Sequence, residues 1–141
     1  MDANDLHIAI NHFPIVGVFI GTCLLLYGLF NDDQPIKKAA NTIILFTAIL
    51  LIPAYFSGAY SRSYKLLNDP MLTTEVLVHN ELAIMATWLG LVLGAFAYAS
   101  LYLSLTKGAF EKSSSRITVA LAIIVLIFLA ITGAAGIAIK H

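Results

Sequence analysis

Charged residues and cysteine are scarce in this chain of 141 residues. Only 11% of its residues are charged, whereas an ordinary soluble domain has about 25%. The formal net charge is zero, so the chain lacks both the basic charge used to bind nucleic acid and a field that would steer an acidic partner. The single cysteine, Cys23, excludes an internal disulfide framework, the paired-cysteine zinc patterns and the C-x-x-C-H segment that tethers a c-type haem. Together these shortages exclude a disordered chain and almost any water-soluble domain.

Signatures of catalysis and of proton-driven transport are also missing. The sequence contains no Gly-rich phosphate loop, and no serine has a convincing base partner. No acidic or basic residue lies in the middle of a long apolar stretch, whereas pumps and secondary carriers normally need one there. The sequence therefore argues against a transporter and leaves enzymatic activity undecided.

What the chain has in abundance is apolar sequence. Hydrophobic residues make up 60% of it, and its mean hydropathy is +0.89. Four apolar stretches, each supplying the roughly 20 residues that a spanning helix needs, cover residues 13–30, 39–60, 79–105 and 117–139. None alternates with a period of two, and a backbone in lipid must satisfy its own hydrogen bonds, so the stretches are predicted to be helices. We expect a single domain over residues 1–141, an all-α transmembrane four-helix bundle of up-down-up-down topology.

The basic residues predict how this bundle is oriented. Two connections, the first and the third, carry most of them: Lys37, Lys38, Lys107, Lys112 and Arg116. The opposite side carries Arg62, Lys65 and Lys140. Since basic residues favour the cytoplasmic side, we expect these two connections in the cytoplasm and both termini on the periplasmic side. The first residues have no basic segment typical of a cleaved signal peptide, so the first span is expected to remain.

All four histidines fall at the outward ends of the predicted spans. His7 and His12 precede the first span, His79 opens the third and His141 closes the fourth. Because the spans alternate in direction, the four histidines share one face of the membrane even if the orientation is reversed. In such a bundle the first and third helices are diagonal and the first and fourth are adjacent. The positions place His12 and His79 in a deeper layer, with His7 and His141 nearer the water.

This layering suits one or two haem b groups held by pairs of histidines. His12 and His79 are the best axial pair, and His7 with His141 would form a second pair or a metal site near the surface. His7 and His12 lie about 140° apart on an ideal helix, so they do not form a one-face pair for a single metal. Ordinary placement of histidine at the membrane interface is the competing interpretation.

Other residues near the outer ends have two interpretations each. Arg62 and Lys65 would pair with haem propionates or lipid phosphates, or are ordinary juxtamembrane cations. Glu75 would hold the second nitrogen of His79 from one turn away or join a metal site, or is simply solvated. Aromatic residues such as Trp88 are interpreted as interfacial anchors. Glycine pairs indicate close helix packing, or room for a flat macrocycle; they are Gly17 and Gly21, Gly90 and Gly94, and Gly133 and Gly136.

Residues 7–15, HIAINHFPI, resemble the opening of a small bacterial four-span membrane family of unknown function, which reads His-Pro-x-x-x-His-Phe-Pro. Further resemblance lies in residues 53–58, in His79, and in the Gly-Ala-Ala-Gly run 133–136 followed by His141. The chain departs from the family at Ile8, where the family usually has proline. The resemblance implies a four-helix protein of the bacterial inner membrane with a histidine cluster as its site, and it brings no established activity.

Three functions remain after these observations. The leading hypothesis is a b-type cytochrome, an electron-transfer protein or subunit rather than a stand-alone enzyme, which passes electrons between the quinone pool and a periplasmic redox carrier. The second is a periplasm-facing site for copper, zinc or iron, formed by the four histidines with or without Glu75. The third is an accessory subunit of a respiratory or photosynthetic complex, with partner helices or further copies of itself packed on its lipid-facing surface.

Overall fold

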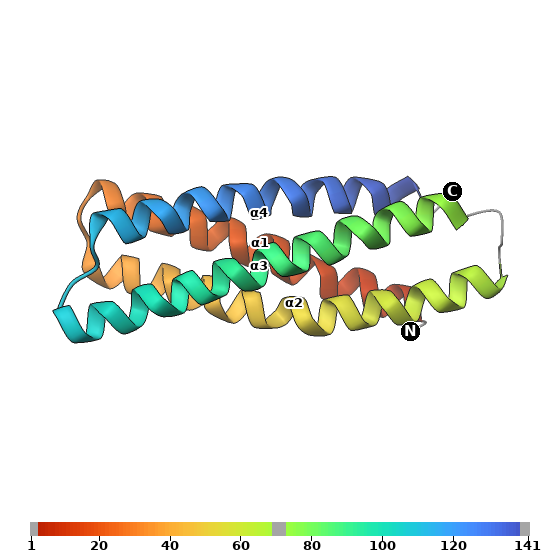
Figure 1. The fold of residues 1–141 in the computed structure, drawn as a ribbon, viewed down its shortest axis with the longest axis horizontal. Helices are drawn as coiled ribbons and strands as arrows, with labels where there is room; N and C mark the ends of the chain where they lie inside the picture. Colours follow the sequence, from red (N-terminus) through yellow and green to blue (C-terminus); the bar gives the residue numbers. More distant parts are fainter. Residues whose placement is uncertain (1–2, 69–72, 139–141) are drawn as a thin grey trace.

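The protein is a bundle of four long antiparallel helices (Figure 1). The computed structural model describes residues 3–68 and 73–138. The helices are α1 (Ala3–Phe30), α2 (Gln34–Asn68), α3 (Thr73–Lys107) and α4 (Lys112–Ala138). Each helix packs against its neighbours in sequence, and α4 also packs against α1. The helices therefore form a closed square with α1 diagonal to α3, which confirms the predicted four-helix bundle.

The helices extend beyond the predicted apolar stretches. α2 and α3 have 35 residues each, or about 52 Å at 1.5 Å per residue, whereas the hydrocarbon core of a bilayer is about 30 Å thick. α1 continues across Pro14 and α2 across Pro53. Each helix contains a window long and apolar enough to cross a membrane, and only 28% to 33% of each window is buried inside the bundle. The remaining residues of each window are half-buried or exposed, as expected for a multi-pass membrane protein whose helices contact lipid.

Four glycines of α1 and α3 lie close against α2. A Cβ atom on Gly17 would lie 2.3 Å from Oγ1 of Thr47, and one on Gly94 would lie 2.4 Å from Cβ of Ala48. Gly21 and Gly90 leave equally little space, against Ile44 and Leu51. The first two predicted glycine pairs thus lie against α2, one from α1 and one from α3. A side chain at Gly94 would force the helices apart, because the atom that it would meet is the Cβ of Ala48.

The connection between α1 and α2 lies at the end of the bundle that is opposite to where α1 begins, and several hydrogen bonds stabilise it. Asp32 adopts a left-handed conformation (φ 52°), and the carboxylate of Asp33 accepts a 3.0 Å hydrogen bond from the Ile36 amide, which caps the first turn of α2. Gln34 accepts a 2.8 Å hydrogen bond from the Phe110 amide, so the two short connections are tied together.

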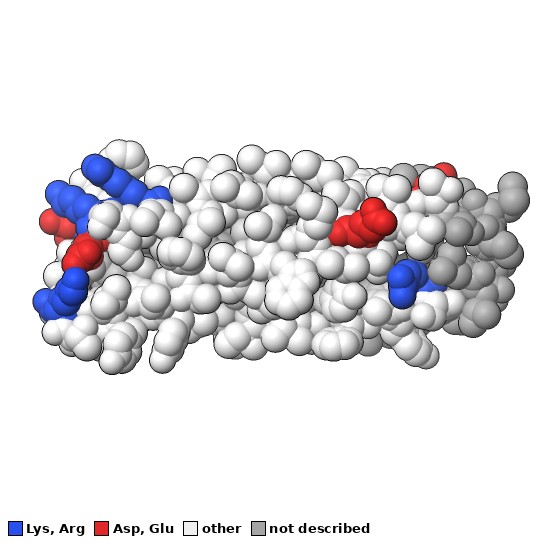
Figure 2. Space-filling view, in the orientation of Figure 1, with Lys and Arg blue, Asp and Glu red and all other residues white. Residues whose placement is uncertain are grey.

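The structure corrects the placement of Lys37, which the sequence assigned to a polar connection. Lys37 lies in the first turn of α2, its side chain is completely buried, and its ammonium pairs with Asp32. Basic side chains nevertheless gather at this end of the molecule, where both short connections lie (Figure 2). We call it the basic end, and the opposite end, where α1 begins and α4 ends, the histidine end.

Candidate functional site

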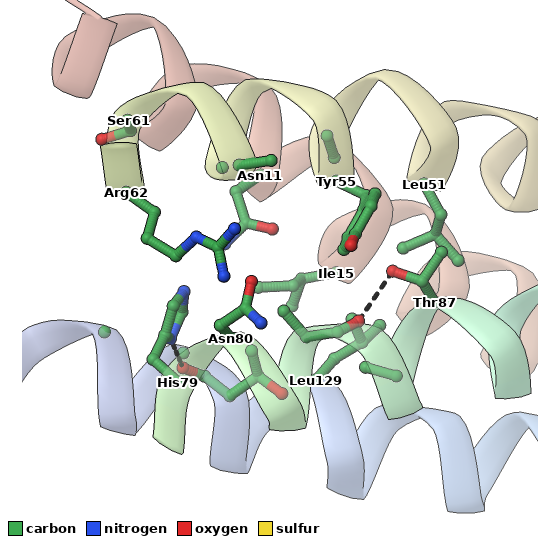
Figure 3. Close-up of a pocket in the computed structure, with 18 of the residues that line it drawn as sticks. Asn11, Ile15, Leu51, Tyr55, Ser61, Arg62, His79, Asn80, Thr87 and Leu129 are labelled. Atoms are coloured by element: carbon green, nitrogen blue, oxygen red, sulfur yellow. Dashed lines mark hydrogen bonds between the residues drawn. The ribbon is translucent and has the colours of Figure 1, made fainter. Parts of the chain in front are cut away.

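A cavity of about 380 Å³ lies toward the histidine end and is lined by all four helices (Figure 3). α1 supplies Asn11 and His12, α2 supplies Tyr55 and Arg62, and α3 supplies His79, Asn80 and Thr87. Thr132, Gly133 and Gly136 line it from α4. Most of the other lining residues are aliphatic or alanine. An apolar cavity of this size with a few convergent polar groups is typical of sites for small molecules and cofactors.

His79 is held in a defined orientation by the helix beside it. Its Nδ1 lies 2.9 Å from the carbonyl oxygen of Thr132 on α4. A carbonyl only accepts, so Nδ1 carries a proton and donates it, and in the neutral form of the ring the lone pair is then on Nε2. Figure 3 shows the second ring nitrogen on the side of Arg62, away from the Thr132 contact. The imidazole is thus fixed in the tautomer that suits a metal ligand.

Space beside this imidazole is provided by the two glycines of α4. A Cβ atom on Gly136 would lie 3.1 Å from Cε1 of His79, so this glycine lets the ring lie directly against α4. A Cβ atom on Gly133 would meet nothing within 4 Å. Of the two interpretations of the glycine pairs, close packing therefore describes Gly136, whereas Gly133 faces open space in the cavity.

His12 and Arg62 complete the polar part of the lining. His12 is exposed and borders the cavity from α1, the helix diagonal to the one that carries His79. The guanidinium of Arg62 extends from α2 into the cavity, toward His79 and Asn80 (Figure 3). Arg62 brings a permanent positive charge with a planar array of donors. The cavity therefore combines two imidazoles with a group suited to a carboxylate.

The structure brings together three of the residues predicted for a site: His12, His79 and Arg62. Glu75 lies in the first turn of α3 with an exposed side chain, and it is not part of the cavity lining. The hydrogen-bond partner recorded for Nδ1 of His79 is the Thr132 carbonyl. The side chains of His7 and Lys65, and all of His141, lie outside the described residues. Among the residues that are described, no three or more of His, Cys, Asp and Glu lie close enough to hold a metal ion.

Several lining residues were not predicted. The sequence did not predict the role of Thr132, because this residue contacts His79 through its backbone carbonyl and lies 53 positions away along the chain. A sequence pattern carries no information on such a contact. The sequence also did not predict that Tyr55 and Thr87 line a cavity, because each lies within a long apolar stretch. One sequence feature could have indicated that α4 lines a site. Residues 132–136, TGAAG, are small or polar, although they lie at the end of the otherwise most apolar span.

Comparison of the chain with models of protein families, with curated proteins and with solved structures finds no match.

Proposed function

We propose that this protein is a membrane b-type cytochrome, an electron-transfer protein or subunit that holds haem between α1 and α3. The observation that carries the proposal is that His12 and His79, on diagonal helices, border one apolar cavity. A cavity between the facing helices of a bundle is a common place for such a cofactor, and haem iron is commonly ligated by imidazole.

The lining residues fit the chemical demands of haem. His79 is oriented through Nδ1 by a backbone carbonyl, as ligating histidines almost always are. The apolar part of the lining would lie against the porphyrin ring, and Arg62 would pair with a propionate at the polar side of the cavity. Bound haem would supply one-electron oxidation and reduction. The chain's own residues would fix its ligation, its orientation and the polarity around it, which are the features that set its potential.

The cellular setting belongs to the same proposal. The sequence resemblance supports a bacterial inner membrane, and the basic residues support the periplasm for the histidine end. A haem there would exchange electrons with a membrane quinone and with a periplasmic redox carrier. The outward-facing apolar surface of the helices would contact lipid, further copies of the chain or the subunits of a host complex.

The test is the visible spectrum of the protein purified from cells with ample haem supply, oxidised and then reduced with dithionite. A pyridine haemochrome assay is run on the same sample. We expect a sharp α-band and a b-type haemochrome. His79→Ala and His12→Ala are each expected to lose or strongly weaken the band, because each removes an axial ligand. Glu81→Ala, two positions from His79 and exposed, is the matched control and should keep it.

A rescue experiment separates loss of a ligand from misfolding. Adding imidazole to the His79→Gly variant is expected to restore a low-spin spectrum, because free imidazole can occupy the space of the missing ring. A wild-type protein without porphyrin would refute the proposal. Elemental analysis would then distinguish a copper, zinc or iron site, with His7, His141 and Glu75 as the further ligands, from a structural accessory subunit.

A further inference from the structure

A second hollow lies on the outside of the bundle, between α2 and α3. It measures about 250 Å³ and is lined by Ile52, Tyr55 and Phe56 of α2 and by Thr87 and Trp88 of α3, among others. We call it the α2–α3 groove. Trp88 follows His79 by nine positions in the same helix, which places the groove about 13 Å nearer the basic end at 1.5 Å per residue. Both of its helices are within candidate membrane spans at this level, so the groove faces lipid.

The groove and the histidine cavity share a wall. Tyr55 and Thr87 line both of them. In Figure 3 the Tyr55 side chain points from α2 toward the cavity, and the Thr87 hydroxyl lies across from it on α3. The two hydroxyl groups therefore stand where a lipid-facing surface meets the polar interior of the bundle.

The chemistry of the groove differs from that of an ordinary lipid-facing surface. Phe56 and Trp88 are 65% and 66% exposed and form aromatic walls, and the rings of Tyr55 and Phe56 meet edge to face with centroids 5.8 Å apart. The Thr87 hydroxyl donates to the Ala83 carbonyl at 2.7 Å, so its oxygen can still accept. No hydrogen bond is recorded for the Tyr55 hydroxyl within the described part of the chain, and this hydroxyl can donate.

We propose that the α2–α3 groove binds the head ring of a membrane quinone. The flat ring would lie against Phe56 and Trp88, one ring oxygen would accept a hydrogen bond from the Tyr55 hydroxyl, and the isoprenoid tail would continue into the lipid. In the quinol form, the hydroxyl at that ring position would also donate to the Thr87 oxygen. A cavity of about 150 Å³ is known to hold benzene, so the groove has room for one substituted ring. An acyl chain would fill the apolar part but would leave the Tyr55 hydroxyl unmatched, which is costly away from water. The use of this ligand as an electron donor or acceptor rests on the proposed haem, whereas its binding does not.

Trp88, the only tryptophan in the chain, provides a built-in reporter because quinones quench indole fluorescence. The experiment titrates haem-free protein in lipid nanodiscs with a short-chain ubiquinone and a short-chain menaquinone. We expect saturable quenching for at least one of them. Tyr55→Phe is expected to weaken binding of the quinones up to about tenfold, because one hydrogen bond contributes about 0.5–1.5 kcal/mol. Phe56 and Trp88 remain in place in this variant.

In the matched control, the tryptophan is moved from the groove to another lipid-facing position. In a Trp88→Phe, Phe19→Trp variant the indole lies on α1, at a position where phenylalanine is 58% exposed, so only unsaturable quenching from quinone dissolved in the lipid is expected. Equal quenching at both positions would overturn the proposal. So would full competition by an isoprenoid alcohol that has the tail and no ring, since the groove would then be a tail site.

The two proposals fail separately. Saturable quenching of a protein that never carries haem would retain the quinone site and refute the cytochrome. A haem spectrum together with equal quenching at both indole positions would support the cytochrome and refute the quinone site.

Discussion

Some glycines of this bundle let two helices pack closely, whereas Gly133 leaves open space in the cavity. The atoms that face each glycine determine which of these roles it has. At Gly94 an added Cβ would lie 2.4 Å from Cβ of Ala48, so glycine at this position lets α2 and α3 approach closely. At Gly133 an added Cβ meets nothing within 4 Å, and the missing side chain is part of the cavity. The sequence offers the same residue type in both cases, and only the surroundings distinguish packing from space.

The first prediction follows from Gly133. Gly133→Leu should fill the cavity and abolish haem binding while the bundle stays at least as stable, because glycine inside a helix costs about 0.5–1 kcal/mol relative to alanine. Haem content and the thermal unfolding midpoint of the haem-free protein are measured together. The control is Gly94→Leu, which should lower the midpoint because overpacking typically costs about 1–3 kcal/mol. Full haem content in Gly133→Leu would show that the ligand binds elsewhere.

At the scale of elements, the connection between α1 and α2 is fixed by charges as well as by its cap. The hydrogen bond from Lys37, and then its positive charge, hold the pKa of the Asp32 carboxyl below its ordinary value of 3.8. A pKa that is lower in the folded protein means that the carboxylate stabilises the fold at pH values above about 3.8. This contribution is lost as the pH falls through the folded-state pKa. Lys37 is completely buried while Asp32 is 57% exposed, so the carboxylate is the accessible half of the pair.

The second prediction tests this pair. Asp32→Asn should unfold at a lower temperature than the wild type at pH 7, because it leaves the buried ammonium without its counter-charge. The difference should shrink as the pH falls from about 3.8 through the lower folded-state pKa, below which the wild-type carboxylate is protonated as well. Thermal unfolding in one detergent at several pH values measures it. Glu111→Gln is the control: its partner Lys107 is 54% exposed, so its effect at pH 7 should be smaller and should disappear in high salt. A pH-independent difference for Asp32→Asn would contradict the assignment.

At the scale of the whole molecule, the two ends of the bundle differ in character. Basic side chains gather at the end with the two short connections, whereas the cavity with its two imidazoles lies toward the other end. Because basic residues are retained in the cytoplasm, this asymmetry predicts that the cavity lies near the periplasmic surface. A redox carrier would then reach it from that side only.

The third prediction concerns this orientation. Replacing Cys23 by serine leaves a chain without cysteine, into which Ser63→Cys at the histidine end or Ser113→Cys at the basic end can be introduced. Both serines are exposed. A membrane-impermeant maleimide added to intact spheroplasts should label the cysteine at 63, and should label the one at 113 only after the membrane is opened. The opposite pattern would place the histidine end in the cytoplasm.

The sequence by itself determined the architecture. Four apolar stretches separated by polar segments admit one arrangement of the backbone in lipid, since every amide must be satisfied within its own helix. Alternating spans then bring the outward ends of the first and third helices to the same side, so the neighbourhood of His12 and His79 followed from topology alone. The ends of the helices were less accurate, because α2 and α3 continue well beyond the apolar residues that revealed them.

Only the tertiary structure decided which side chains meet. The carbonyl of Thr132 orients His79, Lys37 is buried against Asp32, and Tyr55 and Thr87 stand between the cavity and the lipid-facing groove. These contacts depend on the rotation of each helix about its axis. A hydropathy pattern with apolar residues on every face of a helix does not specify that rotation. In the folded bundle, the glycines of α1 and α3 face α2 at close range.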